Sequence, residues 1–250
     1  IGMGVDPKRI FAELYGKETG LLKGKGGSMH LSAPEYGFLG TAAIVACTIP
    51  VAVGAAFANK QAGNGKVVAV FFGDGAIDEG SFWESLNSAC LMKLPVLFVC
   101  EDNGLTVHAP NIIRHGYDSI TDVVAQFKCN AFSEETTDVE RIYALTNEVI
   151  ASIKETQMPG FLHLKYYRYR EHVGINEDFD AGYRPREEFE KWFEKDPIAL
   201  QRKRLLGGNY SEETINHIEK DIDAQIENSR KAAQKMPFPE SHEIYEDVYA

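Results

Sequence analysis

Two strand-like segments, each followed by a turn rich in oxygen-bearing side chains, constrain the fold of this chain more than any other feature of its sequence. Residues 67–72 form a continuous apolar run rich in β-branched and aromatic residues, and residues 95–100 form a second run. Such runs are typical of strands buried on both faces of a parallel sheet. We therefore expect an α/β fold with a doubly wound, mostly parallel sheet flanked by helices.

The segments between and after these strands have helical signals. Ser81 and Glu84 are spaced as a capping box, which predicts a helix that ends near Met92. Asp138 predicts the start of another helix, and residues 160–166 predict a third strand. The apolar stripe predicted for the helix after Asp138 consists of Ile142, Leu145, Val149, Ile150 and Ile153.

An uncharged segment, residues 38–58, is long enough to span a membrane. It is interrupted by glycine, threonine and Pro50, and neither aromatic nor basic residues flank it as a membrane belt. We expect no membrane association, but a buried loop followed by a buried helix. That helix should begin near Pro50, because proline suits the first helical turn.

Charge and cysteine content narrow the functional classes. The 250-residue chain has 26 Lys and Arg against 37 Asp and Glu, a net charge of −11, which argues against a nucleic-acid-binding protein. Its cysteines have no CxxC spacing, so we expect them to be reduced and structural, as in a cytosolic enzyme. They are Cys47, Cys90, Cys100 and Cys129.

The character of the chain changes near its C-terminal third. Residues 167–184 are charged and lack periodicity, which indicates a long mobile loop. We expect residues 1–184, including this loop near the active site, to form the α/β domain. Residues 185–250 should form a helical C-terminal extension that packs on the body or on a partner. Its narrow apolar stripe consists of Ile215, Ile218, Ile222 and Ile226.

The turns after the first two strands suggest a binding site. Asp74 follows the first strand, and Asn103 follows the second, one strand–helix–strand repeat later. Both should lie at the carboxyl edge of the sheet, where ligands of doubly wound folds bind. A carboxylate and a carboxamide suit Mg²⁺, and the N–H groups of Gly75 and Ala76 could bind phosphate near a helix start. A Gly-Asp-Gly tripeptide alone usually forms only a turn, so the spacing to Asn103 is the stronger signal.

A series of motifs in fixed order extends over essentially the whole chain. It comprises residues 24–30, 49–54, 73–76, 93–95, 101–103, Tyr169, His172, residues 183–188, 196–198 and 247–250. This series resembles the alpha subunit of the thiamine-diphosphate-dependent first component of 2-oxo acid dehydrogenase complexes. That family includes the pyruvate, branched-chain and acetoin dehydrogenases.

The resemblance implies a cofactor site. Asp74 and Asn103 would bind Mg²⁺ through their side chains, and the carbonyl of Leu105 would be a third protein ligand. Gly75 and Ala76 would contact the diphosphate of the cofactor.

The resemblance also implies roles for residues elsewhere in the chain. The backbone around Ala43 and Val45 would bind the aminopyrimidine, and the Val45 side chain would help to keep the cofactor bent. His172 would be catalytic and would lie near the thiazolium and the substrate carboxylate or the diphosphate.

The implied activity is oxidative decarboxylation of a small 2-oxo acid, or cleavage of acetoin, with acyl transfer to lipoamide on a lipoyl-bearing acyltransferase core. In this family a beta subunit supplies the activating glutamate, so the chain would be active only in an α2β2 heterotetramer. Its expected location is the bacterial cytoplasm or an organellar matrix.

Two departures from the family pattern leave alternatives open. The resemblance begins after a family segment whose Tyr–Arg pair contacts the cofactor phosphate, so that segment is cut off, lost or supplied by another polypeptide. Val173 follows His172 where regulated relatives carry serine, so phosphorylation there is not expected. The alternatives are a stand-alone thiamine-diphosphate decarboxylase or carboligase, a transketolase-like half-enzyme, and a non-catalytic truncated subunit.

Overall fold

The computed structural model describes residues 1–246, so the predicted motif at residues 247–250 lies outside the described residues. The chain forms two compact units, one of residues 45–205 and one of residues 1–44 with 206–250. The domain boundary expected at residue 184 stays a prediction. The helices are α1 (Pro7–Leu14), η1 (Pro34–Tyr36), α2 (Thr48–Ala62), η2 (Asp74–Asp78), α3 (Gly80–Met92), η3 (Asn111–Ile113), α4 (Ile120–Val124), α5 (Val139–Thr156), η4 (Phe179–Ala181), α6 (Arg186–Phe193), α7 (Pro197–Gly207), α8 (Glu212–Gln234) and η5 (Ser241–Tyr245).

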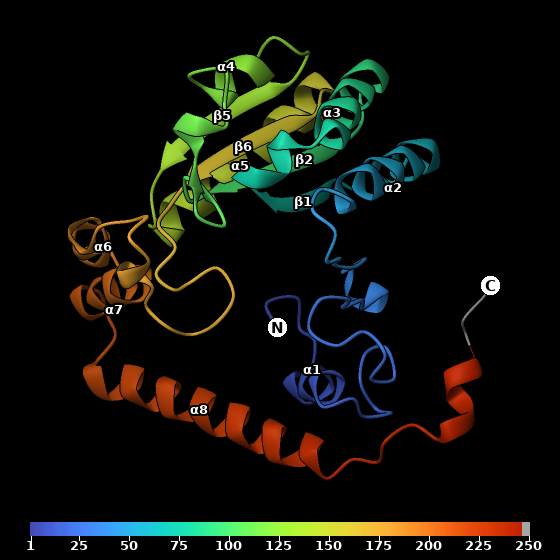
Figure 1. Cartoon of the computed structure of the whole chain (residues 1–250), viewed down its shortest axis with the longest axis vertical. Helices are drawn as coiled ribbons and strands as arrows, with labels where there is room; N and C mark the ends of the chain where they lie inside the picture. The colour runs from blue at the N-terminus through green and yellow to red at the C-terminus, as the bar shows by residue number, and fades with distance from the viewer. Residues whose placement is uncertain (247–250) are drawn as a thin grey trace. The chain divides into compact units, whose positions relative to one another are not determined.

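The larger unit is built on a parallel sheet with strand order β1-β2-β6-β5 (Figure 1). Its strands are β1 (Val68–Gly73), β2 (Val96–Asp102), β5 (Asn130–Glu135) and β6 (Gly160–Lys165). The predicted α/β fold and its three predicted strands are confirmed. The edge strand β5 is not predicted from the sequence, because it is polar and partly exposed and lacks an apolar run. A two-stranded hairpin, β3 (Leu105–Thr106) with β4 (Ala109–Pro110), follows β2.

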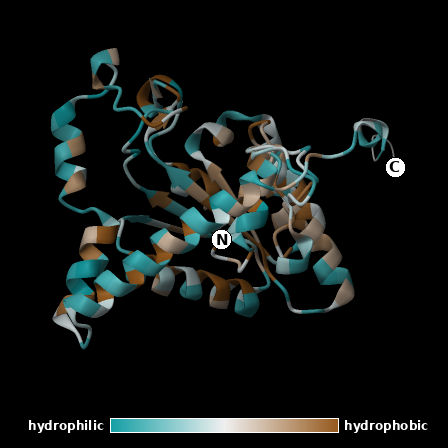
Figure 2. Ribbon diagram, turned by 90° about the horizontal axis from the view of Figure 1, so that it is seen from below, coloured by the Kyte–Doolittle hydropathy of each residue, from teal (hydrophilic) through white to brown (hydrophobic). Residues whose placement is uncertain are grey.

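Alternate residues of the central strands enter two different cores. Phe98 and Phe161 pack with residues of α2, α3 and α4 on one face. Leu97 and Leu162 pack with Leu145, Val149 and Ile153 of α5 on the other face. Burial on both faces explains the unbroken apolar runs of β2 and β6. The expectation is wrong for β1, which lies at the edge of the sheet and alternates buried and exposed residues. Figure 2 shows hydrophobic residues concentrated in the sheet and the helices beside it.

Two predicted helix starts have different outcomes. Asp138 caps α5 as predicted, since its carboxylate accepts hydrogen bonds from the N–H groups of Glu140 at 3.0 Å and Arg141 at 3.3 Å. The capping box predicted at Ser81 is wrong, because Glu79 is the N-cap and α3 begins at Gly80. The short helix η2 leads into α3 one residue after it ends, which places Ser81 inside the first turn.

The uncharged segment 38–58 is only partly as predicted. Helix α2 begins at Thr48 with Pro50 in its first turn, which confirms the predicted start. The preceding loop is not buried, since Leu39 and Ile44 are 54% and 71% exposed, and isolated apolar side chains are common on protein surfaces. Among residues 1–246, no helix is both long enough and apolar enough to cross a membrane.

The remaining segments largely follow their predictions. The four cysteines are free thiols in the described chain. Residues 167–184 contain only the short helix η4, so the predicted loop is confirmed, and its mobility stays a prediction. In the smaller unit α8 packs against α1. Of the predicted apolar stripe of α8, Ile215 is buried and the other three isoleucines are exposed.

Candidate functional site

The carboxyl ends of β1 and β2 bring Asp74 and Asn103 together, as predicted. The two strands are paired in register to Gly73 and Glu101, so the next residues of each strand emerge side by side. Asp74 opens η2 and is 2% exposed. Burial and the nearby Asp102 raise the pKa of the Asp74 carboxyl to about 6, against the opposing charge of Arg114 and the backbone hydrogen bonds from Asp74 and Asn103.

Arg114 lies between the carboxylates of Asp74 and Asp78 and pairs with both. Its guanidinium Nη2 lies 2.5 Å from Oδ2 of Asp74, and it also pairs with Asp78 and hydrogen-bonds the side-chain oxygen of Asn111. His115 Nε2 lies 3.3 Å from Asp78. Arg114 is not predicted from the sequence, because it follows the hairpin by a few residues and only the folding of that loop returns it to Asp74.

The turn that carries Asn103 is held by its own side chains. The Asn103 side-chain oxygen accepts a hydrogen bond from the Leu105 N–H at 3.1 Å, and Asp102 accepts one from the Gly104 N–H at 2.8 Å. These side-chain-to-backbone bonds stabilise the turn between β2 and β3, which begins at Leu105. The Asn103 backbone also hydrogen-bonds the Asp74 carboxylate, and the role of the Leu105 carbonyl as a ligand stays a prediction.

A buried Asp–His pair connects this turn to the neighbouring strand β6. His163 of β6 donates from Nε2 to Asp102 Oδ2 at 2.8 Å, and its Nδ1 lies 3.1 Å from the Thr121 hydroxyl. Burial alone would raise the pKa of the Asp102 carboxyl, but the hydrogen bonds from His163 and Gly104 hold it below its usual value. Asp102 thus connects the sheet interior to the turn that carries Asn103.

Gly75 lies in a space that excludes any side chain. A Cβ atom at this position would stand 2.5 Å from Oγ1 of Thr106 in β3. That Thr106 hydroxyl is buried and has no hydrogen-bond partner among the described residues. A buried hydroxyl without a partner is costly, so this point beside Gly75 is suited to a ligand that accepts or donates a hydrogen bond. Ala76, the other predicted phosphate contact, is buried in η2.

The loop 167–184 is attached to the hairpin that follows Asn103. Arg168 donates from both terminal nitrogens to the Val107 carbonyl at 3.2 Å and from Nη2 to the Tyr183 hydroxyl at 2.8 Å. The Tyr183 ring stacks on His108 with centroids 4.3 Å apart. His172 itself is exposed. The loop is thus near the turn of Asn103, and the catalytic role of His172 stays a prediction.

A buried ion pair closes the base of this loop. The Arg184 side chain is 2% exposed, pairs with Asp178 and donates to the carbonyls of Arg168 and Arg170. These bonds join the two ends of the loop. Arg184 belongs to the predicted motif at residues 183–188, whereas Asp178 is not distinguished in the sequence from the other acidic residues of the loop.

The remaining predicted residues lie at the boundary between the units. Ala43 belongs to the smaller unit and Val45 to the larger one, and both are exposed. Their roles stay predictions. In the smaller unit, the buried carboxylate of Glu13 accepts hydrogen bonds from four backbone N–H groups of the predicted motif and its flank. The donors are Leu22, Gly24, Gly26 and Gly27, at 2.7–3.1 Å.

The donor chemistry at the carboxyl edge agrees with a magnesium–diphosphate group. In the described part of the chain, no cluster of three or more His, Cys, Asp or Glu side chains is arranged to hold a metal ion. A site with one carboxylate, one carboxamide and one backbone carbonyl is of another type, since Mg²⁺ keeps its other positions for water and phosphate. The Thr106 hydroxyl beside Gly75, which has no partner within residues 1–246, fits that arrangement.

Comparison with known proteins agrees with this site. A family model described as dehydrogenase E1 component matches residues 1–242. The chain is 34% identical to the pyruvate dehydrogenase E1 component subunit alpha of Rickettsia felis, over 98% of this chain and 75% of the relative. It is 32% identical to the subunit of the same name from Zymomonas mobilis, over 99% of this chain and 70% of the relative. The family predicted from the sequence motifs is therefore confirmed: the chain belongs to the dehydrogenase E1 component family.

Proposed function

We propose that this chain is the alpha subunit of a thiamine-diphosphate-dependent 2-oxo acid dehydrogenase. The observation that carries the proposal is the buried Asp74 at the end of β1, bonded to the backbone of Asn103 at the end of β2. Membership of the dehydrogenase E1 component family, which depends on thiamine diphosphate, supports the same function. Pyruvate is the first substrate to test, because the similar proteins are named pyruvate dehydrogenase subunits.

In this proposal Asp74, Asn103 and the carbonyl of Leu105 hold Mg²⁺, and Gly75 and Ala76 contact the diphosphate. The Thr106 hydroxyl, which has no partner within the described residues, supports this assignment because it lies beside Gly75. A dication and a guanidinium compete for the same carboxylate oxygen. Mg²⁺ at Asp74 would compete with Arg114 for the carboxylate, and the pair with Asp78 would still hold Arg114 beside the site.

The residues outside the sheet edge complete the proposed site. The backbone around Ala43 and Val45 binds the aminopyrimidine, and Val45 supports the bent cofactor. When bound, the cofactor supplies the electron sink for decarboxylation. His172 is the proposed catalytic residue, near the thiazolium and the substrate carboxylate or the diphosphate, on the loop that Arg168 attaches to the hairpin at Val107.

The proposed assembly contains partners that supply what this chain lacks. A beta subunit in an α2β2 heterotetramer contributes the activating glutamate, and a lipoyl-bearing acyltransferase core accepts the acyl group. The substrate is a small 2-oxo acid, and neither nucleic acid nor membrane is a partner. The proposed location is the bacterial cytoplasm or an organellar matrix.

Calorimetric titration of thiamine diphosphate with Mg²⁺ tests this proposal. The titration is made into the chain alone and into the chain co-expressed with the beta subunit from the same genome. We expect binding only in the mixture, followed by lipoamide acylation with one of pyruvate, a branched-chain 2-oxo acid or acetoin. Binding in neither sample would favour a non-catalytic subunit. Decarboxylation without acyl transfer would favour a stand-alone decarboxylase or carboligase.

A further inference from the structure

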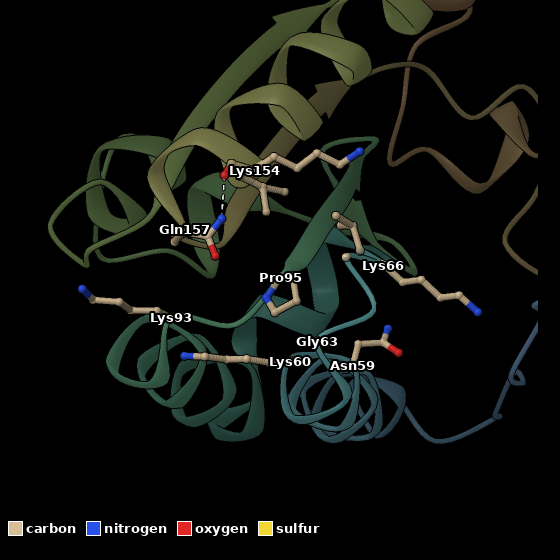
Figure 3. A pocket seen from close by; sticks show the side chains of 11 residues that line it. Asn59, Lys60, Gly63, Lys66, Lys93, Pro95, Lys154 and Gln157 are labelled. Atoms are coloured by element: carbon tan, nitrogen blue, oxygen red, sulfur yellow. Dashed lines mark hydrogen bonds between the residues drawn. The ribbon is translucent and has the colours of Figure 1, made fainter.

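A pocket lies at the opposite, amino-terminal edge of the same sheet (Figure 3). It has a volume of about 240 Å³ and is lined where the chain enters β1 and β2, and by the C-terminal ends of α2, α3 and α5. Its lining includes Lys60, Lys66, Lys93 and Lys154, and we call it the lysine pocket. It shares no residue with the candidate cofactor site.

The lysine pocket is positive in an otherwise acidic chain. Its four lysines are exposed, and none of the described residues that line it is acidic. None of the four ammonium groups forms an ion pair within residues 1–246, and Lys60 donates to the Met92 carbonyl at 2.6 Å. In Figure 3 the side chains of Lys60 and Lys93 extend to one side of Pro95, and those of Lys66 and Lys154 extend to the other.

A purely structural role accounts for only part of this charge. Helices α2, α3 and α5 all end at the pocket, and each helix C-terminus carries roughly half a negative elementary charge. Three such ends compensate roughly 1.5 of the four positive charges. A surplus of positive charge remains, in a chain whose net charge is −11.

The shape and the helix ends decide which anion fits. A compact anion deep in the pocket would face three helix C-termini, which repel it. The lining also includes the apolar side chains of Val67, Pro95 and Ile153, which favour an apolar group there. An occupant with a negative charge on each side of its apolar group would match the two lysine pairs.

We propose that the lysine pocket binds a short acidic segment of a partner protein. One apolar side chain of that segment enters the pocket against Val67, Pro95 and Ile153. Carboxylates before and after it pair with Lys60 and Lys93 on one side, and with the other two lysines opposite. The proposal does not depend on cofactor binding at the other edge of the sheet.

Fluorescence anisotropy with a labelled, end-blocked Glu-Glu-Leu-Glu-Glu peptide tests the proposal on the full chain at low ionic strength. We expect binding that is weakened about tenfold in the variant K66E/K154E, because two attractive charges become repulsive. The matched control K128E/K191E makes the same change in net charge at exposed lysines outside the pocket and should bind within about twofold of the unchanged chain. The peptides Gln-Gln-Leu-Gln-Gln and Glu-Glu-Gly-Glu-Glu should both bind more weakly.

Three results would overturn the proposal. The first is equal peptide affinity for K66E/K154E and its control. The second is equal binding of the glutamine peptide, which would exclude an electrostatic origin. The third is tighter binding of tripolyphosphate or a thymidine oligonucleotide than of the acidic peptide. Circular dichroism verifies folding, and the neutral variant K66Q/K154Q gives an intermediate loss if K66E/K154E fails to fold.

Discussion

The two edges of the sheet differ in the sign of their charges and in how those charges are paired. At the carboxyl edge, the buried carboxylates of Asp74 and Asp102 have basic partners from this chain, Arg114 and His163. At the amino edge, four exposed lysines surround an open pocket without a carboxylate in its lining among the described residues. The charges of Asp74 and Asp102 are paired inside the chain, whereas the lysines of the amino edge are exposed.

Chain direction explains this difference. In a parallel sheet, helices begin near the carboxyl ends of the strands and end near the amino ends. Helix starts favour negative groups, whereas helix ends favour lysine. Helix α3 begins soon after Asp74 and ends at Met92, directly before Lys93, so this single helix contributes to both edges. The predictions below test whether the two edges are independent.

The largest effect is expected from D74A. This change removes the buried carboxylate that is proposed to bind Mg²⁺, and it should weaken cofactor binding at least about 100-fold. The control D78A removes the other carboxylate of Arg114 and should change cofactor affinity less than about tenfold. Calorimetry of the complex with the beta subunit measures both. Equal losses for the two variants would contradict the assignment of Asp74 to the metal.

A loss of stability is expected from H163L. The change leaves the buried Asp102 without its main partner, which typically costs about 3–5 kcal/mol. Urea unfolding measures the free energy of unfolding. The matched variant S133A removes only a 3.4 Å contact to the same ring and should cost less than about 1 kcal/mol. A cost for H163L as small as that for S133A would show that the pair is not needed for folding.

A smaller effect is expected from G75A, because its Cβ would collide with Thr106. Such overpacking costs about 1–3 kcal/mol. The double change G75A/T106A removes the opposing hydroxyl and methyl groups and should recover most of that loss. Thermal unfolding of the two variants and of T106A forms a complete cycle. Additive losses in the cycle would mean that the two residues do not touch.

The smallest effect is a dependence of stability on pH. The folded-state pKa of Asp74, about 6, lies above its unfolded value, so the folded chain binds more protons between these values. Stability should therefore fall by about 1–2 kcal/mol as pH rises from about 4 to 7, after solvent screening is allowed for. D74N should remove this slope. Mg²⁺ affinity should rise with pH over the same range, since the metal binds the ionised carboxyl.

Much of the carboxyl edge follows from the sequence, because strand period and turn chemistry are local. Asp74 and Asn103 come together once the two strands are recognised and paired in parallel. Arg114, His163 and Thr106 could not be predicted, since loop folding or strand order brings them to the site. The lysine pocket was also missed, because its residues come from three helix ends and two loops. The polar edge strand β5 lacks the apolar pattern that revealed the other three strands.

The carboxylate of Glu13 has a consequence for how the smaller unit can evolve. It holds residues 22–27 through backbone N–H groups alone, so side chains there are not needed to maintain the loop. Position 25 is then more open to mutational drift than position 23, where Lys23 has a left-handed backbone (φ 54°) and lies 3.8 Å from Glu243. Gly24 and Gly26 should not tolerate substitution, because an added Cβ would meet backbone atoms at 2.4 Å and 2.2 Å. Variation along this motif should therefore concentrate at position 25, with Glu13 as the fixed residue on which the loop depends.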